Sequence, residues 1–154
     1  MIAGRRSKAI AFVAILALTT FGALATASAQ PADIKAIDKA WQDHYARGNY
    51  PAARIDAEQL ERLVKARFGP DHAFYALALN KLGIAFQSQG KHVEAEGLFK
   101  RALTIREKVL GANHSDVGQT LNNLALVYGA QAKYTEAAGL FERALAITSV
   151  THKR

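Results

Sequence analysis

The feature that most constrains the fold of this chain is an internal repeat with a period of 42 residues. The segment Gly69–His72 recurs as Gly111–His114. Further identities fall at the same offset without a gap, and they pair Leu79-Asn80 with Leu121-Asn122, Leu82 with Leu124, Lys91 with Lys133, Glu94-Ala95 with Glu136-Ala137, Gly97-Leu98-Phe99 with Gly139-Leu140-Phe141, and Arg101-Ala102-Leu103 with Arg143-Ala144-Leu145. Repeats of this length are typical of solenoids, in which each unit buries its apolar face only against its neighbours.

A weaker third copy precedes the two clear ones. Gly48 lies one period before Gly90, and Ala53 lies one period before Ala95. The chain therefore divides into three predicted units, which are residues 31–69, 70–111 and 112–150.

Each unit has the pattern of two α-helices joined by a short turn. In the second unit, Leu79, Leu82 and Phe86 recur at steps of three and four residues within a predicted helix over 73–88. A second apolar stripe follows over 93–110. No segment alternates with a period of two, so the sequence predicts an all-α fold without strands.

The ends of these helices carry recognisable signals. Gly69 and Gly111 are expected to end one helix, because glycine tolerates the left-handed turn that closes a helix. Asp71, and Asn113 or Ser115 one repeat later, are expected to accept hydrogen bonds from the first amides of the next helix.

Small and large side chains alternate as a close-packed helix pair requires. Ala95 and Ala102 are expected where two helices approach closely, with Phe99 filling the space beside them. Ala137, Ala144 and Phe141 repeat this arrangement in the third unit. Since one pair cannot bury its apolar stripe alone, the pairs are expected to stack in line.

At this point the sequence resembles a known family, the tetratricopeptide repeats (TPR), in the long variety found in kinesin light chains. The resemblance covers about residues 69–150. It rests on the segments Leu79-Asn80-Lys81-Leu82-Gly83, Leu121-Asn122-Asn123-Leu124-Ala125, Gly90-Lys91, Glu94-Ala95, Phe99-Lys100-Arg101-Ala102-Leu103, Arg106-Glu107-Lys108-Val109-Leu110-Gly111 and Asn113-His114. It implies a right-handed superhelical stack of about three antiparallel helix pairs.

The first unit departs from that pattern. Trp41 stands at the position of Gly83, and Ala57 replaces the large aromatic Phe99. The unit is either a divergent repeat or a helical hairpin that caps the N-terminal end of the stack.

The resemblance also implies a protein-binding scaffold, with a concave groove lined by the first helix of each repeat. We expect the polar face left over after core packing to contact a peptide, because an asparagine amide can both donate to and accept from a peptide backbone. The groove candidates are Asn80, Lys81 and Gln87 in the second unit, Gln119, Asn122 and Asn123 with Leu126 between them in the third, and Gln42 and Tyr45, beside Lys35 and Asp38, in the first. The alternative for each is a solvated residue or one bonded to a neighbouring helix.

The sequence gives little support for catalysis, a metal site or a cofactor. It contains no cysteine, which excludes thiolate ligands and cysteine nucleophiles. His72 and His114 recur at the repeat period, so each belongs to its own linker rather than to one centre. Neither a phosphate-binding glycine loop nor a nucleophile elbow is present. We therefore expect a protein that is not an enzyme and needs no cofactor.

Residues 1–29 have the organisation of a secretory signal peptide. A basic head is followed by an uncharged apolar run over 9–25, and Ala27-Ser28-Ala29 supplies the small residues of a cleavage site. The prediction is an exported protein, periplasmic or secreted, of which 30–154 is the mature TPR domain; a retained membrane anchor is the alternative. Removal of this segment lowers the net charge from +7 to +4, which is only a weak argument for a nucleic-acid partner, and none is expected for an exported protein.

Two main classes of function remain open. In the first, the chain is an adaptor that holds a protein or peptide partner in its groove. In the second, it is an assembly subunit that stacks on a copy of itself or on a larger repeat array, through an apolar C-terminal face around Leu140, Leu145 and Ile147. A scaffold for an anionic cell-envelope polymer is a more distant third, which rests on the mature charge alone.

Overall fold

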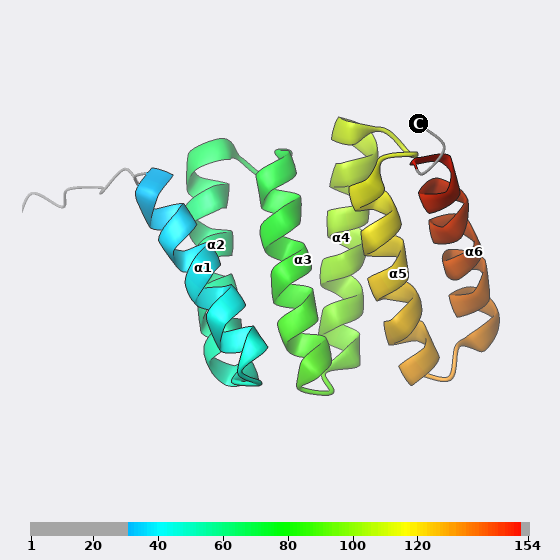
Figure 1. The fold of residues 1–154 in the computed structure, drawn as a ribbon, viewed down its shortest axis with the longest axis horizontal. Coiled ribbons are helices and arrows are strands. Elements are labelled where there is room, and N and C mark those ends of the chain that lie inside the picture. The colour runs from blue at the N-terminus through cyan, green and yellow to red at the C-terminus, as the bar shows by residue number, and fades with distance from the viewer. Residues whose placement is uncertain (1–30, 152–154) are drawn as a thin grey trace, which may run out of the picture.

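The fold of the chain is a row of three helical hairpins (Figure 1). The computed structural model describes residues 31–151, and the predicted signal peptide therefore lies outside the described residues. The helices are α1 (Pro31–Ala46), α2 (Tyr50–Phe68), α3 (Ala73–Ser88), α4 (His92–Leu110), α5 (Ser115–Ala130) and α6 (Tyr134–Thr151). No strand occurs between residues 31 and 151, so the predicted all-α stack of antiparallel pairs is confirmed.

The first helices of the three hairpins, α1, α3 and α5, lie side by side along one face of the stack. In Figure 1 they face the viewer, and the second helices α2, α4 and α6 form the layer behind them. Each hairpin packs on the next, because α3 contacts α2 and α5 contacts α4. The core therefore continues from one end of the stack to the other.

The linkers between hairpins correct one sequence-based expectation. Gly69 and Gly111 end α2 and α4 with φ of 84° and 89°, as predicted. The residues that cap the following helices are the histidines, however, and not Asp71, Asn113 or Ser115. The Nδ1 atoms of His72 and His114 each accept a hydrogen bond of 3.1 Å from a backbone N–H of the next helix.

The alanines predicted at close helix contacts are buried. Ala95 and Ala102 have no exposed surface, and Phe99 beside them is also fully enclosed. Gly83 explains how that ring fits, because a Cβ atom at this position would lie 2.6 Å from Cε1 of Phe99. The aromatic ring of α4 therefore lies directly against the backbone of α3.

The first hairpin fills the same space from its other helix. Trp41 on α1 stands at the position of Gly83 and is buried, together with Ala57 at the position of Phe99. A large ring on the first helix and a small residue on the second thus replace the reverse arrangement in the next repeat. The departure seen in the sequence is a compensated exchange of volume.

Candidate peptide-binding face

The predicted site residues all belong to α1, α3 and α5, whose shared surface we call the first-helix face. The structure corrects the expectation that Asn80 and Lys81 are left over after core packing: they are only 2% and 8% exposed. Both side chains face a neighbouring first helix, and contacts between helices occupy them.

Lys81 joins α3 to α1. Its Nζ atom lies 3.0 Å from Oδ1 of Asp38 and 3.8 Å from the centre of the Trp41 ring. Gln42, which stays exposed, donates a hydrogen bond of 2.7 Å to Oδ2 of the same aspartate. Lys81 therefore ties two repeats together, with its charge balanced by a carboxylate and covered by an indole.

Asn80 joins α3 to α5 in a similar way. Its Oδ1 atom accepts a hydrogen bond of 3.2 Å from Nδ2 of Asn123, which is half-buried. Asn122, one repeat after Asn80, remains exposed. The two asparagines of the repeat motif therefore have different surroundings in the second and third units.

The other candidates are accessible to differing degrees. Tyr45 is partly exposed and stacks on Trp41, with ring centres 5.1 Å apart. Gln87 is half-buried, whereas Gln119 and Leu126 are exposed. These side chains give the first-helix face a mixed surface of amides and apolar groups.

A pocket of about 400 Å³ lies between α1, α2 and α3, and the sequence did not reveal it. Its lining is mainly apolar and consists of Ile34, Lys35, Asp38, Leu60, Val64, Arg67, Phe68, Phe74 and Leu77. Buried Leu60 and Val64 of α2 form its floor, while α1 and α3 supply its walls. The pocket therefore opens on the first-helix face.

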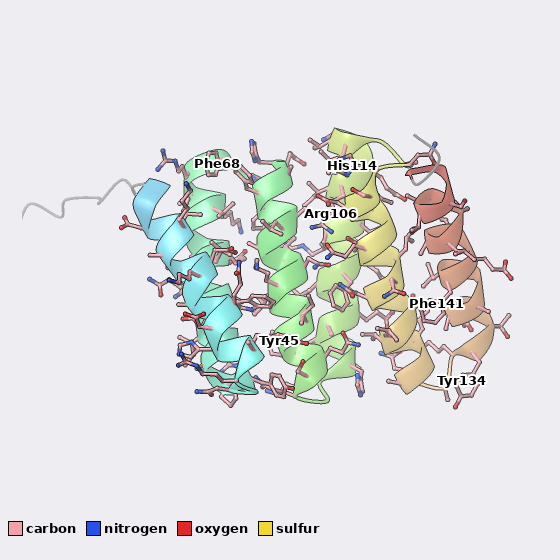
Figure 2. All side chains as sticks on the ribbon, viewed as in Figure 1. Tyr45, Phe68, Arg106, His114, Tyr134 and Phe141 are labelled. Atoms are coloured by element: carbon pink, nitrogen blue, oxygen red, sulfur yellow. The ribbon has the colours of Figure 1, made fainter. Side chains whose placement is uncertain are left out.

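Aromatic rings form one wall of this pocket. Phe68, near the end of α2 in Figure 2, lies 5.3 Å from Phe74 at an edge-to-face angle, and 4.9 Å from the ring of His72. Phe74 is 51% exposed even though it is a large apolar residue. Such exposure beside a hollow is typical of a surface that receives a partner.

The equivalent space at the next junction is filled by Arg106, which stands one period after Val64. Its Nη1 atom donates hydrogen bonds of 2.7 Å to the backbone oxygen of Asp116 and to Oγ1 of Thr120, and a longer one to Gln119. Burial lowers the pKa of the Arg106 guanidinium, and the nearby Asp116 carboxylate opposes that shift. The sequence indicates the pocket only through the difference between these equivalent positions, where the short Val64 replaces the long Arg106.

The wall residues differ between the two junctions as well. Phe74 is followed one period later by Asp116, and Leu77 by Gln119. The first junction is therefore hollow and apolar where the second is filled and polar, although both have the same arrangement of helices.

The predicted apolar C-terminal face is also corrected in part. Ile147 is buried in a core cluster with Val117 and Leu121, and Leu140 packs against that cluster. The large hydrophobic residues exposed on α6 are Tyr134 at its start and Phe141 and Leu145 further along. The face is thus centred nearer to the middle of α6 than the sequence indicated.

The described part of the chain has neither a cluster of metal ligands nor a helix that could cross a membrane. Among residues 31–151, no three His, Asp or Glu side chains lie close enough together to hold a metal ion. No helix in the same range combines the length and the hydropathy of a membrane-crossing segment.

Helical hairpins stacked at a fixed period, with first helices on one face, define a helical-repeat solenoid. The chain belongs to the tetratricopeptide repeat family, whose model matches residues 42–108 and 86–149. The fold is that of a protein–protein interaction scaffold. No curated protein sequence matches the chain.

Solved structures show the same fold at low identity. BtubC (BKLC) from P. vanneervenii is 20% identical with a TM-score of 0.73, and the alignment covers 82% of this chain and 51% of that one. A kinesin-light-chain-like protein of Podosopora anserina with nearly identical TPR-like repeats is 24% identical, with a TM-score of 0.67 and coverage of 82% and 60%. The chain thus spans between half and two thirds of these two proteins.

A third structure is matched over nearly its whole length. The TPR domain of Arabidopsis FLU is 17% identical, with a TM-score of 0.68, and the alignment covers 76% of this chain and 95% of that domain. At these identities the comparisons establish the fold.

Proposed function

We propose that this protein is an exported, non-enzymatic scaffold that binds a peptide or partner segment along the first-helix face. The observation that carries the proposal is the apolar pocket between α1, α2 and α3, with exposed Phe74 and Leu77 in its wall. The TPR fold supports the same conclusion, because stacked hairpins offer an extended surface for a partner.

The surface has two parts with different roles. The pocket accepts an apolar side chain of the partner, whose burial supplies most of the affinity. The exposed amide of Asn122 is available to the partner's backbone, and those of Gln42 and Gln119, which each make one hydrogen bond within the stack, keep further donors and acceptors for it. With only three hairpins the contact is short, so we expect a dissociation constant on the order of micromolar.

Export is proposed from the sequence alone. The organisation of residues 1–29 as basic head, apolar run and cleavage site supports a periplasmic or secreted location. The mass of the chain recovered from the exported fraction of an expression host tests this: loss of residues 1–29 is expected, and retention of them would favour the membrane anchor.

A displayed library of random peptides, selected against the purified chain, tests the binding function. Fluorescence anisotropy then gives the affinity of the enriched peptides. The double variant Phe74→Asp with Leu77→Gln carries the residues that stand one period later, so the first junction acquires the wall of the second. We expect it to weaken binding by tenfold or more, on the order of 1.4 kcal/mol or above.

The matched control is Val93→Gln on α4, which removes an apolar side chain that is 76% exposed and remote from the pocket. Its binding should equal that of the unmodified chain, and circular dichroism should show full helicity for both variants. Enriched peptides that bind the pocket variant and the unmodified chain equally well would contradict the proposal.

A further inference from the structure

The inter-helix contacts of the first-helix face have a fixed register. Asp38 pairs with Lys81, and Asn80 pairs with Asn123, so each contact joins one residue to another 43 positions later. Asn122 occupies the place of Asp38 and Asn80 in the last hairpin. It is exposed, and its side chain makes no hydrogen bond within residues 33–149.

Asn122 lies at the edge of a hollow of about 570 Å³ between α5 and α6, at the outer end of the stack. We call this surface the end face, and its lining residues are Ser115, Gly118, Gln119, Asn122, Phe141, Ala144, Leu145 and Thr148. Leu145 is 69% exposed and Phe141 39% exposed. Phe99, one period before Phe141, has no exposed surface, because it lies against Gly83 of its own hairpin and clusters with Leu124 and Val127 of the following one.

The end face contains no charged side chain among its lining residues. Two identical faces can therefore meet without like-charge repulsion. The amide of Asn122 is self-complementary as well, because it can donate to a second asparagine and accept from it at once. These properties favour a second copy of the chain over a charged partner.

The opposite end of the stack does not complement this surface. On α1, Asp43 stands one period before Ala85 and two before Val127, and both of these are fully buried. Val127 clusters with Ala95 and Phe99 of the preceding hairpin. A head-to-tail contact would place that carboxylate against Phe141 and Leu145, and burial of an unpaired charge is costly. An open row of copies is therefore disfavoured.

We infer that two copies of this chain associate end face to end face about a twofold axis. Phe141 and Leu145 of each copy pack on α5 and α6 of the other, and the two Asn122 amides bond to each other. A twofold contact of this kind closes after two copies, so the assembly is a dimer. The pocket between α1, α2 and α3 remains open in both copies, whereas Gln119 and Asn122 at the far edge of the first-helix face are covered. The inference does not depend on the proposed peptide binding.

Sedimentation velocity of the purified chain over a wide concentration series tests the inference, and the expected result is a monomer–dimer equilibrium without larger species. Leu145→Glu places one new charge on each copy and is expected to raise the dimer dissociation constant on the order of a hundredfold. Val93→Glu is the matched control on α4, at a position that is also exposed, and it should leave the equilibrium unchanged.

A mixture of the Leu145→Glu and Leu145→Lys variants tests whether the end face binds a second copy of the chain or a different molecule. Opposite charges then face each other, so the mixture should form dimers at concentrations where each variant alone is a monomer. A monomer at every concentration, a dimer that survives Leu145→Glu, or masses that increase through successive multiples would each overturn the inference. Peptide affinity measured on Leu145→Glu should not fall, because the pocket between α1, α2 and α3 shares no residue with the end face, so the two proposals can fail separately.

Discussion

The first and second junctions of the stack have the same helices in the same places, yet one is hollow and the other is filled. At the first junction, Val64 leaves a pocket of about 400 Å³ between α1, α2 and α3. At the second, Arg106 extends into the equivalent space and bonds to α5. The backbone alone therefore does not decide whether a junction is hollow, because side chains at equivalent positions of the repeat leave the space open in one junction and fill it in the other.

The hairpins themselves show the same principle in their interiors. Trp41 and Ala57 fill the first hairpin, whereas Gly83 and Phe99 fill the second. The large ring moves from one helix to the other while the shared volume remains occupied. Divergence between repeats is thus tolerated where it is compensated, and it creates a pocket where it is not.

The largest expected effect on stability comes from adding a second large ring to the second hairpin without removing the first. Gly83→Trp alone should cost more than about 4 kcal/mol in the free energy of unfolding, because even a Cβ atom there meets the Phe99 ring at 2.6 Å. Adding Phe99→Ala copies the first hairpin and should recover about 2 kcal/mol or more. Urea denaturation of both variants measures this.

The single variant Phe99→Ala completes a double-mutant cycle with the two variants above. We expect it to lower the free energy of unfolding by about 3–5 kcal/mol, because it leaves a cavity. If the double variant is no more stable than Gly83→Trp alone, the two hairpins do not fill one common volume, and the exchange described above is wrong.

A smaller effect is expected from giving the second junction the residue of the first. Arg106→Val should lower the free energy of unfolding by about 2–3 kcal/mol, because hydrogen bonds to Asp116 and Thr120 are lost and a cavity remains. Lys108→Val on the same helix is the control, since that side chain is largely exposed, and it should change stability by less than about 0.5 kcal/mol. Equal stabilities for both variants would show that Arg106 does not hold its junction together.

The smallest effect concerns the turns inside the hairpins. Gly48 and Gly90 adopt positive φ, but the third hairpin has Ala132 in the same conformation at φ 60°. Ala132→Gly should therefore stabilise the chain by about 0.5–1 kcal/mol, and Gly90→Ala should destabilise it by a similar amount. A Cβ atom at Gly90 would have no heavy atom within 4 Å. The change in stability therefore reports the backbone conformation alone and no side-chain clash. Thermal unfolding of the pair measures it, and shifts of the same sign would refute this explanation.

The sequence was informative wherever structure follows from local pattern. The 42-residue period predicted the stack, the apolar spacing predicted six helices, and Ala95 and Ala102 were expected at the close contacts where they lie. These features occur in more than one repeat, so the pattern in one repeat supports the structure predicted for the next.

The sequence was less informative where the outcome depends on how hairpins are placed against each other. Asn80 and Lys81 lie on a polar helix face, but the neighbouring first helices cover them. His72 was assigned to its linker correctly, although its capping bond was assigned to Asp71. The contribution of the candidate residues to peptide binding remains a prediction.

The central claim is that the first junction, and not the second, receives a partner. Methyl-resolved NMR of the chain titrated with a library-selected peptide tests it directly. We expect shifts of the Ile34, Val64 and Leu77 methyl signals around the pocket. Shifts confined to Leu124 and Val127, which cluster with Phe99 of α4 at the second junction, with the first junction unchanged, would contradict the claim.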